Sequence, residues 1–276
     1  MNRSRLEAFN GLFGYKPIIG MVHLPPLPGA PLYDDKGISD VIDYAVQEGL
    51  KLQEGGVSAI EVENYLDASY FPGTVGPELV AAMSIIAHEV RKVVDIPLGV
   101  CVLADPIASI AVAHAAKAEF IRATFFTEAS VDVSGLVLGR PHEILRYRKF
   151  LDPSIKIFAD VHIKHSAPLA PRPIEQSAYD TAYFLADAII ISGKHTGFPT
   201  NPEDVRVVKE AVSDVPVLIG SGMNVTTASE LLSVADGAIV GSTLKVEGDA
   251  KNPVDPERVK KMVSVVEEIR ANIRKS

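Results

Sequence analysis

An eightfold alternation of short β-branched runs with longer segments of helical period constrains the fold of this chain most strongly. The runs occupy residues 16–23, 57–63, 97–103, 119–124, 156–163, 188–192, 215–220 and 237–241. The helical segments that follow them are predicted at about 39–55, 77–94, 106–117, 141–151, 175–186, 202–213, 226–234 and 256–274. This series of strand-then-helix units predicts an α/β fold with a parallel sheet.

We expect a single (β/α)8 TIM barrel. Eight units in 276 residues fit the length of about 250 residues that is typical of such a barrel. The barrel domain is predicted to span residues 1–276, with residues 1–15 as an N-terminal extension. An open doubly wound sheet is the alternative, but the first predicted strand lacks the G-x-G-x-x-G that marks nucleotide binding in that fold.

The composition excludes several classes of protein. A net charge of −8 and the absence of a basic stripe argue against a nucleic-acid partner, because a phosphate backbone requires clustered cations. No run approaches the roughly 18 apolar residues of a membrane-spanning helix, and the N-terminus has no signal-peptide core. Cys101 is the sole cysteine, which excludes an internal disulfide and favours a buried thiol over a nucleophile. We therefore expect a cytoplasmic protein.

Strand alternation sorts side chains into those that face the helices and those that face the barrel interior. In the run at 156–163 the odd positions are apolar, so the even positions face inward, and the same reasoning applies at 57–63 and 119–124. The predicted interior set is ionisable and comprises Glu61, Glu63, Arg122, Asp160, His162 and Lys164, with His23 at the rim. Because isolated buried charges are costly, these groups are either paired with one another or functional.

We predict that the groups nearest the strand ends perform acid–base chemistry. The proposed catalytic residues are Asp160, His162, Lys164, Glu63 and His23. Further residues expected at the mouth are Asn64, Arg122, Lys194 and His195. A structural ion-pair network is the alternative for Glu61 and Arg122. No cofactor is predicted. A divalent metal ion bound by histidine and carboxylate ligands is kept as an alternative, although Lys164 would repel it.

Two glycine turns near the end of the chain predict a phosphate site. "IGSGM" at 219–223 and "IVGSTLK" at 239–245 each end a predicted strand, the seventh and the eighth. Barrels of this class commonly bind phosphate with the loops after these two strands, since glycine lets backbone N–H groups approach an anion. The predicted phosphate-binding residues are Gly220, Ser221, Gly222, Gly241 and Ser242.

Long motifs give the chain a family resemblance. "KPIIGMVHLPPLPGAP", "VGPELVAAM", "ADVHIKHSAPL", "RPIEQSAYDTA" and "ADGAIVGSTLK" resemble the BtpA family, also called BtpA/SgcQ, and the resemblance extends from about residue 16 to 259. It implies a barrel of the ribulose-phosphate-binding type, and the family's name derives from photosystem I biogenesis. The chain departs from the usual family pattern at Cys101, where asparagine is usual, and in "SGKHTG", where "TGSGTG" is usual.

These observations favour an enzyme that acts on a small phosphorylated metabolite, with isomerase or lyase chemistry at the mouth of the barrel. The alternative is a non-catalytic assembly or regulatory factor of the BtpA type that retains an anion pocket. We expect a phosphorylated small-molecule substrate and association into a homo-oligomer, with no nucleic-acid partner and no transmembrane segment.

Overall fold

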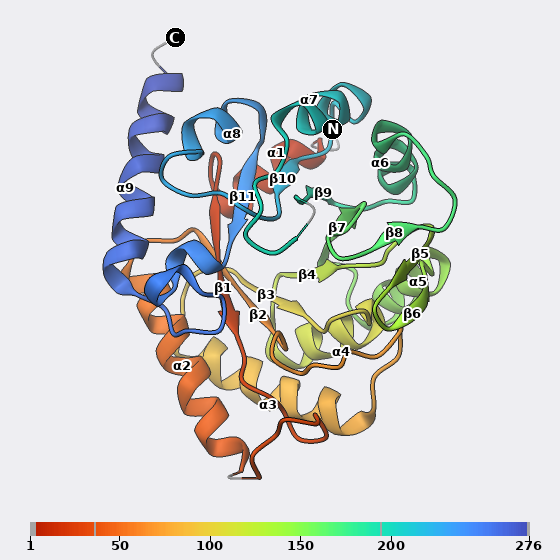
Figure 1. Ribbon diagram of the computed structural model, residues 1–276, viewed down its shortest axis with the longest axis vertical. Coiled ribbons are helices and arrows are strands. Elements are labelled where there is room, and N and C mark those ends of the chain that lie inside the picture. Colours follow the sequence, from red (N-terminus) through yellow and green to blue (C-terminus); the bar gives the residue numbers. More distant parts are fainter. Residues whose placement is uncertain (1–3, 36, 194, 275–276) are drawn as a thin grey trace.

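The computed structural model describes residues 4–35, 37–193 and 195–274, and within them eight parallel strands close into a barrel (Figure 1). The strands are β1 (Ile18–His23), β2 (Ala59–Glu63), β3 (Leu98–Cys101), β4 (Phe120–Ala123), β7 (Lys156–Val161), β9 (Ala188–Ile191), β10 (Val217–Ile219) and β11 (Gly237–Val240). The ring closes where β1 pairs with β11. The predicted fold class is confirmed, and each of the eight predicted runs contains one barrel strand.

Helices follow the strands and cover the outside of the ring (Figure 1). They are α2 (Ile38–Glu54), α3 (Pro77–Val93), α4 (Pro106–Ala116), α5 (Pro141–Leu151), α6 (Ile174–Tyr183), α7 (Pro202–Ala211), α8 (Ala228–Val234) and α9 (Pro256–Ile273). The outward side chains of the strands, such as Ile60, Val62 and Ile121, are fully buried in one apolar layer with these helices. Burial of this layer is the main source of stability of the barrel.

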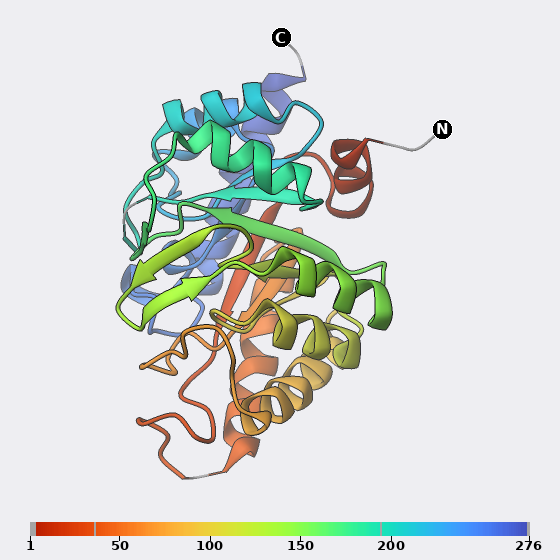
Figure 2. The same ribbon diagram turned by 90° about the vertical axis from the view of Figure 1, so that its right-hand side faces the viewer.

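A helix that the sequence analysis did not predict closes the amino-terminal end of the barrel. It is α1 (Arg5–Phe13), and Figure 2 shows it at the end of the barrel opposite the long loops. Its Phe9 ring lies 5.7 Å from the ring of Phe158, and its Phe13 ring lies 5.5 Å from that of Phe120. This aromatic cluster fills the floor of the barrel, so the polar interior is confined to the carboxyl end.

A small antiparallel sheet projects beside the carboxyl end of the barrel (Figure 2). Strands β5 (Ala129–Asp132) and β6 (Gly135–Leu138) form a hairpin in the segment that follows β4. Strand β8 (Ala167–Pro168) lies in the segment that follows β7 and pairs with β5. The sequence analysis predicted no strand in either segment. The pairing joins the two segments into one ordered wall of the mouth.

Two short 3-10 helices follow β11, namely η1 (Ser242–Leu244) and η2 (Val246–Gly248). The fully buried ion pair of Lys245 and Glu48, with 3.1 Å between Nζ and Oε2, anchors this segment to α2. The same carboxylate oxygen accepts a hydrogen bond from the N–H of Val254. Among the helices of the described residues, none combines the length and the apolar character needed to cross a membrane.

Candidate active site

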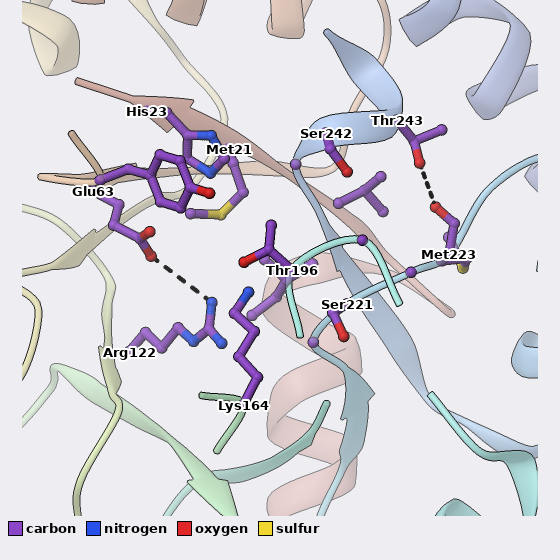
Figure 3. A pocket seen from close by; sticks show the side chains of 17 residues that line it. Met21, His23, Glu63, Arg122, Lys164, Thr196, Ser221, Met223, Ser242 and Thr243 are labelled. Atoms are coloured by element: carbon purple, nitrogen blue, oxygen red, sulfur yellow. Dashed lines mark hydrogen bonds and ion pairs between the residues drawn. The ribbon is translucent and has the colours of Figure 1, made fainter. Parts of the chain in front are cut away.

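A cavity of about 440 Å³, counted to its open mouth, lies at the carboxyl end of the barrel (Figure 3). Its walls come from the ends of five strands and from the loops that follow β7 and β9. The residues that line it include His23, Glu63, Tyr65, Arg122, Lys164, Thr196, Gly220, Ser221, Gly222, Gly241 and Ser242. Four of the predicted ionisable groups, His23, Glu63, Arg122 and Lys164, thus share one cavity with the predicted phosphate turns.

Arg122 is the centre of a buried charge network. Its Nε and Nη2 donate hydrogen bonds of 2.8 Å and 2.9 Å to the two oxygens of Asp160, and its Nη1 lies 3.8 Å from Oε2 of Glu63 (Figure 3). Burial opposes the guanidinium charge, but the two carboxylates outweigh it and raise the pKa of Arg122. The network therefore keeps a permanent cation next to the cavity, with Asp160 fixing its orientation.

Glu61 lies deeper on the same face of β2 and is not part of this pairing. Its side chain is fully buried, and neither carboxylate oxygen has a hydrogen-bond partner within the described parts of the chain. Burial raises the pKa of Glu61 to about 8, with Arg122 acting in the opposite direction. At neutral pH this carboxyl group therefore holds its proton. Its predicted inward orientation is confirmed, but no ion pair joins it to any residue that the structure describes.

Lys164 reaches the cavity from the segment after β7. Figure 3 shows its amine between Arg122 and the loop that carries Thr196. Burial and the neighbouring Arg122 cation lower the pKa of this amine, while Glu63 raises it. A lysine with a lowered pKa gives up its proton more readily than an exposed one, which suits it to act as a proton donor.

His23 ends β1 and is held in one orientation. Its Nδ1 lies 2.8 Å from the carbonyl oxygen of Ala250, and its ring stacks on Tyr65 with 4.2 Å between the ring centroids. Because a carbonyl can only accept, Nδ1 carries the proton and Nε2 keeps a free lone pair. Burial and the positive charge of Lys245 lower the pKa of His23 to about 3. The ring is therefore neutral at physiological pH.

The first glycine turn follows β10 and packs against the loop after β9. Gly222 has a φ of +72°, and a Cβ there would lie 2.2 Å from the carbonyl oxygen of Phe198, so a side chain is excluded by both conformation and contact. The hydroxyl of Ser221 donates to this same carbonyl and accepts from the N–H of Gly193. Ser221 therefore fixes the loop with its side chain and can offer a ligand its backbone.

The second glycine turn follows β11 and faces His23 across the cavity. A Cβ on Gly241 would lie 3.0 Å from Cε1 and 3.2 Å from Nε2 of His23, so glycine lets the ring approach the turn. Ser242 and Thr243 are the first residues of η1, and no hydrogen bond from their N–H groups to another described residue is present. These N–H groups are free to bind an anion.

Comparisons with known proteins agree with this architecture. A profile of the BtpA family matches residues 14–268. The chain belongs to the BtpA family. It is 40% identical over 261 residues to an uncharacterized protein, MJ1115, of Methanocaldococcus jannaschii, covering 94% of this chain and 98% of that one. It is 37% identical over 265 residues to the photosystem I biogenesis protein BtpA of Synechocystis sp., covering 95% and 92% of the two chains.

One solved structure shows how far the fold extends beyond the BtpA family. (S)-3-O-geranylgeranylglyceryl phosphate synthase from Thermoplasma acidophilum, in complex with its substrate sn-glycerol-1-phosphate, superimposes with a TM-score of 0.58. The match covers 97% of this chain and 100% of the synthase at 14% sequence identity. At that identity the similarity establishes the barrel fold and nothing more.

In this BtpA-family chain His162 does not face the barrel interior, which corrects the prediction from strand alternation. Strand β7 ends at Val161, and His162 has a φ of +50°. Its Nε2 lies 3.1 Å from the hydroxyl of Ser177 on α6, and that hydroxyl donates to Glu128. Alternation therefore fails one residue beyond the strand, and His162 lies in a neighbouring polar pocket.

Of three other predicted mouth residues, two lie outside this cavity and the third lies outside the residues that the structure describes. The Asn64 amide is buried, accepts from the N–H of Leu103 and donates to Asp67, so it joins loops of the barrel rim. The His195 ring lies 5.3 Å from that of His165 and lines an adjacent open pocket. Lys194 falls outside the described residues.

The sequence analysis of the BtpA-family chain missed several cavity residues, namely Met21, Tyr65, Thr196, Gly197, Met223, Ile239, Val240 and Thr243. Tyr65 follows β2 by two residues and stacks on His23, and Thr196 belongs to the loop after β9. Tyr65 belongs to the stretch "VENY" at 62–65, which also resembles the BtpA family and was a signal that could have identified it. Thr196 carries no such signal, because its position depends on how the loop folds over the mouth.

A further cluster offers donor atoms of the kinds that bind metal ions. One atom each from Glu61, Glu63 and Cys101 lies within 4.8 Å of the others, and all three residues are buried. Carboxylate and thiolate ligands suit zinc. However, burial, with Glu63 and Glu61, raises the pKa of the Cys101 thiol, and Arg122 beside Glu63 would repel a cation. The cluster therefore has suitable donor atoms, but the raised thiol pKa and the positive charge of Arg122 disfavour the binding of a metal ion.

Proposed function

We propose that this protein is an enzyme that acts on a small phosphorylated metabolite, by isomerase or lyase chemistry at the carboxyl end of the barrel. One observation carries the proposal. The predicted phosphate turns after β10 and β11 line the same cavity as Glu63, Arg122 and Lys164. A substrate with its phosphate on the turns would place neighbouring carbon atoms next to these ionisable groups.

The phosphate would be held by backbone rather than by side-chain hydroxyls. The Ser221 hydroxyl is already committed to Phe198 and Gly193, whereas the N–H groups of Ser242 and Thr243 are free. Backbone N–H groups in a glycine turn form a common anion-binding arrangement. A barrel of the same fold holds sn-glycerol-1-phosphate in its complex, so the fold can accommodate a ligand of this size and charge.

The chemistry would be proton transfer next to a carbonyl group. Glu63 would remove a proton from the carbon beside the carbonyl, and Arg122 would stabilise the negative oxygen that forms. In an isomerisation, Lys164 would then give a proton to the former carbonyl carbon, while the adjacent substrate hydroxyl passes its proton to the enolate oxygen. In an elimination, Lys164 would instead protonate the hydroxyl group that leaves as water from the next carbon. His23 would accept a hydrogen bond from a substrate hydroxyl through Nε2.

The structure suggests supporting roles for the remaining predicted catalytic residues. The Asp160 carboxylate is saturated by the guanidinium of Arg122, so we propose that it positions this cation rather than exchanging protons. His162 lies against Ser177, and we propose that it fixes α6 to the segment after β7. Neither residue would contact the substrate.

The phosphate site can be tested by thermal unfolding in the presence of inorganic phosphate, glycerol phosphate and glycerol. A ligand at 100 times its dissociation constant stabilises by about 2.7 kcal/mol, so the two phosphates should raise the Tm and glycerol should not. A Tm that responds to none of the three would contradict the proposal.

Turnover can be tested by incubating the protein with a panel of sugar phosphates in deuterium oxide and following exchange by NMR. The wild type should exchange a proton next to the carbonyl of its substrate. Glu63→Gln should lose this exchange while keeping the Tm increase with phosphate. Exchange that persists in Glu63→Gln would assign the base to another residue.

A non-catalytic assembly factor is the second candidate, favoured by 37% identity to a photosystem I biogenesis protein. In that case no phosphorylated compound would be turned over, even where phosphate raises the Tm. The proposal also places the protein in the cytoplasm as a homo-oligomer. Light scattering would measure the oligomeric state.

A further inference from the structure

A second cavity adjoins the candidate active site and has mostly apolar walls. It measures about 940 Å³, counted to its open mouth. We call it the apolar compartment, and the residues that define it are Tyr70, Leu103, Ala104, Phe125, Val133 and Ile163. It lies beneath the β5–β6 hairpin, whose turn carries Val133.

The two cavities share a boundary made of the candidate catalytic groups. Glu63, Tyr65, Arg122, Lys164 and Thr196 line both of them. A molecule that occupied both cavities would therefore pass the base, the cation and the proton donor on its way from the glycine turns to the apolar walls. Its reacting atoms would lie between its phosphate and its apolar part.

The walls of the apolar compartment are built from a separate apolar cluster. Ala104 and Phe125 are buried with Val137, and Ile163 packs against them. The polar residues Thr124, Asp132 and His165 also line this cavity. Thr124 accepts a hydrogen bond from the N–H of Ala104, and Nε2 of His165 lies 3.0 Å from the hydroxyl of Thr196. Oδ1 of Asp132 accepts hydrogen bonds from the N–H and hydroxyl of Ser134. The polar group at the hairpin turn is thus partly satisfied within the turn itself.

Val133 leaves apolar surface open at the edge of the compartment. Its side chain is 91% exposed although it lines a cavity with apolar walls. Apolar surface on both sides of a cavity is stabilised when an apolar ligand group displaces the water between them. A small polar sugar phosphate would not provide that contact.

We propose that the apolar compartment binds an aromatic or branched aliphatic group of the substrate. The substrate class would then be a phosphate monoester in which a short reactive carbon segment joins the phosphate to an apolar group. This inference rests on the proposed function, because it takes the glycine turns as the phosphate site. It adds that apolar contacts, rather than hydroxyl groups, give the substrate its specificity.

The test compares two probes, methyl phosphate and phenyl phosphate, by isothermal titration calorimetry. Both carry one phosphate, and they differ in apolar surface. The wild type should bind phenyl phosphate about tenfold more tightly, which corresponds to about 1.4 kcal/mol. Val133→Asn places an uncharged polar group at the edge of the compartment, at a position exposed enough to leave folding intact.

Val133→Asn should reduce the preference for phenyl phosphate to about threefold or less and leave methyl phosphate binding unchanged. Leu136→Asn is the matched control, because Leu136 is also exposed on the hairpin, at 52%, and does not line the compartment. It should keep the wild-type preference.

The outcomes separate two kinds of failure. If the wild type binds neither probe, the phosphate site and the proposed function fail together. If it binds both probes equally, the phosphate site stands and the apolar compartment is not a substrate site. A preference for phenyl phosphate that Val133→Asn and Leu136→Asn both leave unchanged would place the phenyl ring elsewhere and would also overturn the inference.

Discussion

Replacing Glu61 with glutamine would test the electrostatics of the barrel interior. Glu61 is fully buried on β2, and its carboxylate oxygens have no hydrogen-bond partner in the part of the chain that the structure describes. Burial raises its pKa from 4.5 to about 8. The folded protein therefore keeps this proton over a pH range in which the unfolded chain has lost it.

The sign and size of the effect follow from the difference in bound protons. Between pH 4.5 and about 8 the folded state binds one more proton than the unfolded state at Glu61, so the free energy of unfolding falls as the pH rises. One proton corresponds to a slope of about 1.4 kcal/mol per pH unit, and the whole window of roughly 3.5 units to about 5 kcal/mol. Above pH 8 the loss is complete.

Urea denaturation followed by circular dichroism at pH 5, 6, 7 and 8 would measure this dependence. Because glutamine does not titrate, Glu61→Gln should gain about 4 kcal/mol relative to the wild type between pH 5 and pH 8. The exposed Glu54→Gln is the control and should run parallel to the wild type. A difference between Glu61→Gln and the wild type that stays constant with pH would refute the reasoning.

Two further substitutions test the charge network and the first glycine turn by the same denaturation assay. Asp160→Asn should lower the free energy of unfolding by about 3 kcal/mol, because it leaves the buried Arg122 without its bidentate partner. Asp160→Leu combined with Arg122→Met and Glu63→Gln should recover most of this loss, and an equal loss in both variants would contradict a buried-charge origin. Gly222→Ala should cost about 2 kcal/mol and abolish the Tm increase with phosphate, since its Cβ would meet the Phe198 carbonyl at 2.2 Å. Gly11→Ala, whose Cβ would meet nothing within 4 Å, should cost nothing, and equal effects at the two glycines would argue against crowding.

Strand alternation predicted much of the candidate site. The outward apolar positions Ile60, Ile121 and Ile157 are buried against the helices, as expected. The inward positions on the first two of these strands carry Glu63, which lines the cavity, and Arg122, which forms the charge network. This reasoning works because the side chains of a strand alternate between two faces with a fixed period of two.

The same reasoning failed where strands end. His162 follows Val161 with a φ of +50°, and its ring turns to Ser177 instead of the interior. Lys164 does line the cavity. Its position is set by the course of the segment after β7, because strand alternation no longer applies there. Beyond the last paired residue, tertiary contacts and not periodicity set the direction of a side chain.

Elements without a strong local period were also missed. The helix α1 has two buried residues, Phe9 and Phe13, and its place is fixed by the rings of Phe120 and Phe158 at the floor of the barrel. In the β5–β6 hairpin only Val137 is buried, so the sequence of the hairpin does not alternate between buried and exposed positions. Neither element could be placed before the barrel was known.

The sequence by itself determined the eight strand–helix units and the two glycine turns, because local backbone geometry and side-chain period encode them. Only the tertiary structure decided which of these parts meet. Closure of β1 against β11 brings His23 next to Gly241, more than 200 residues along the chain. Folding of the hairpin over the mouth creates the apolar compartment. Such contacts between distant segments depend on the closed ring, and no local pattern in the chain records them.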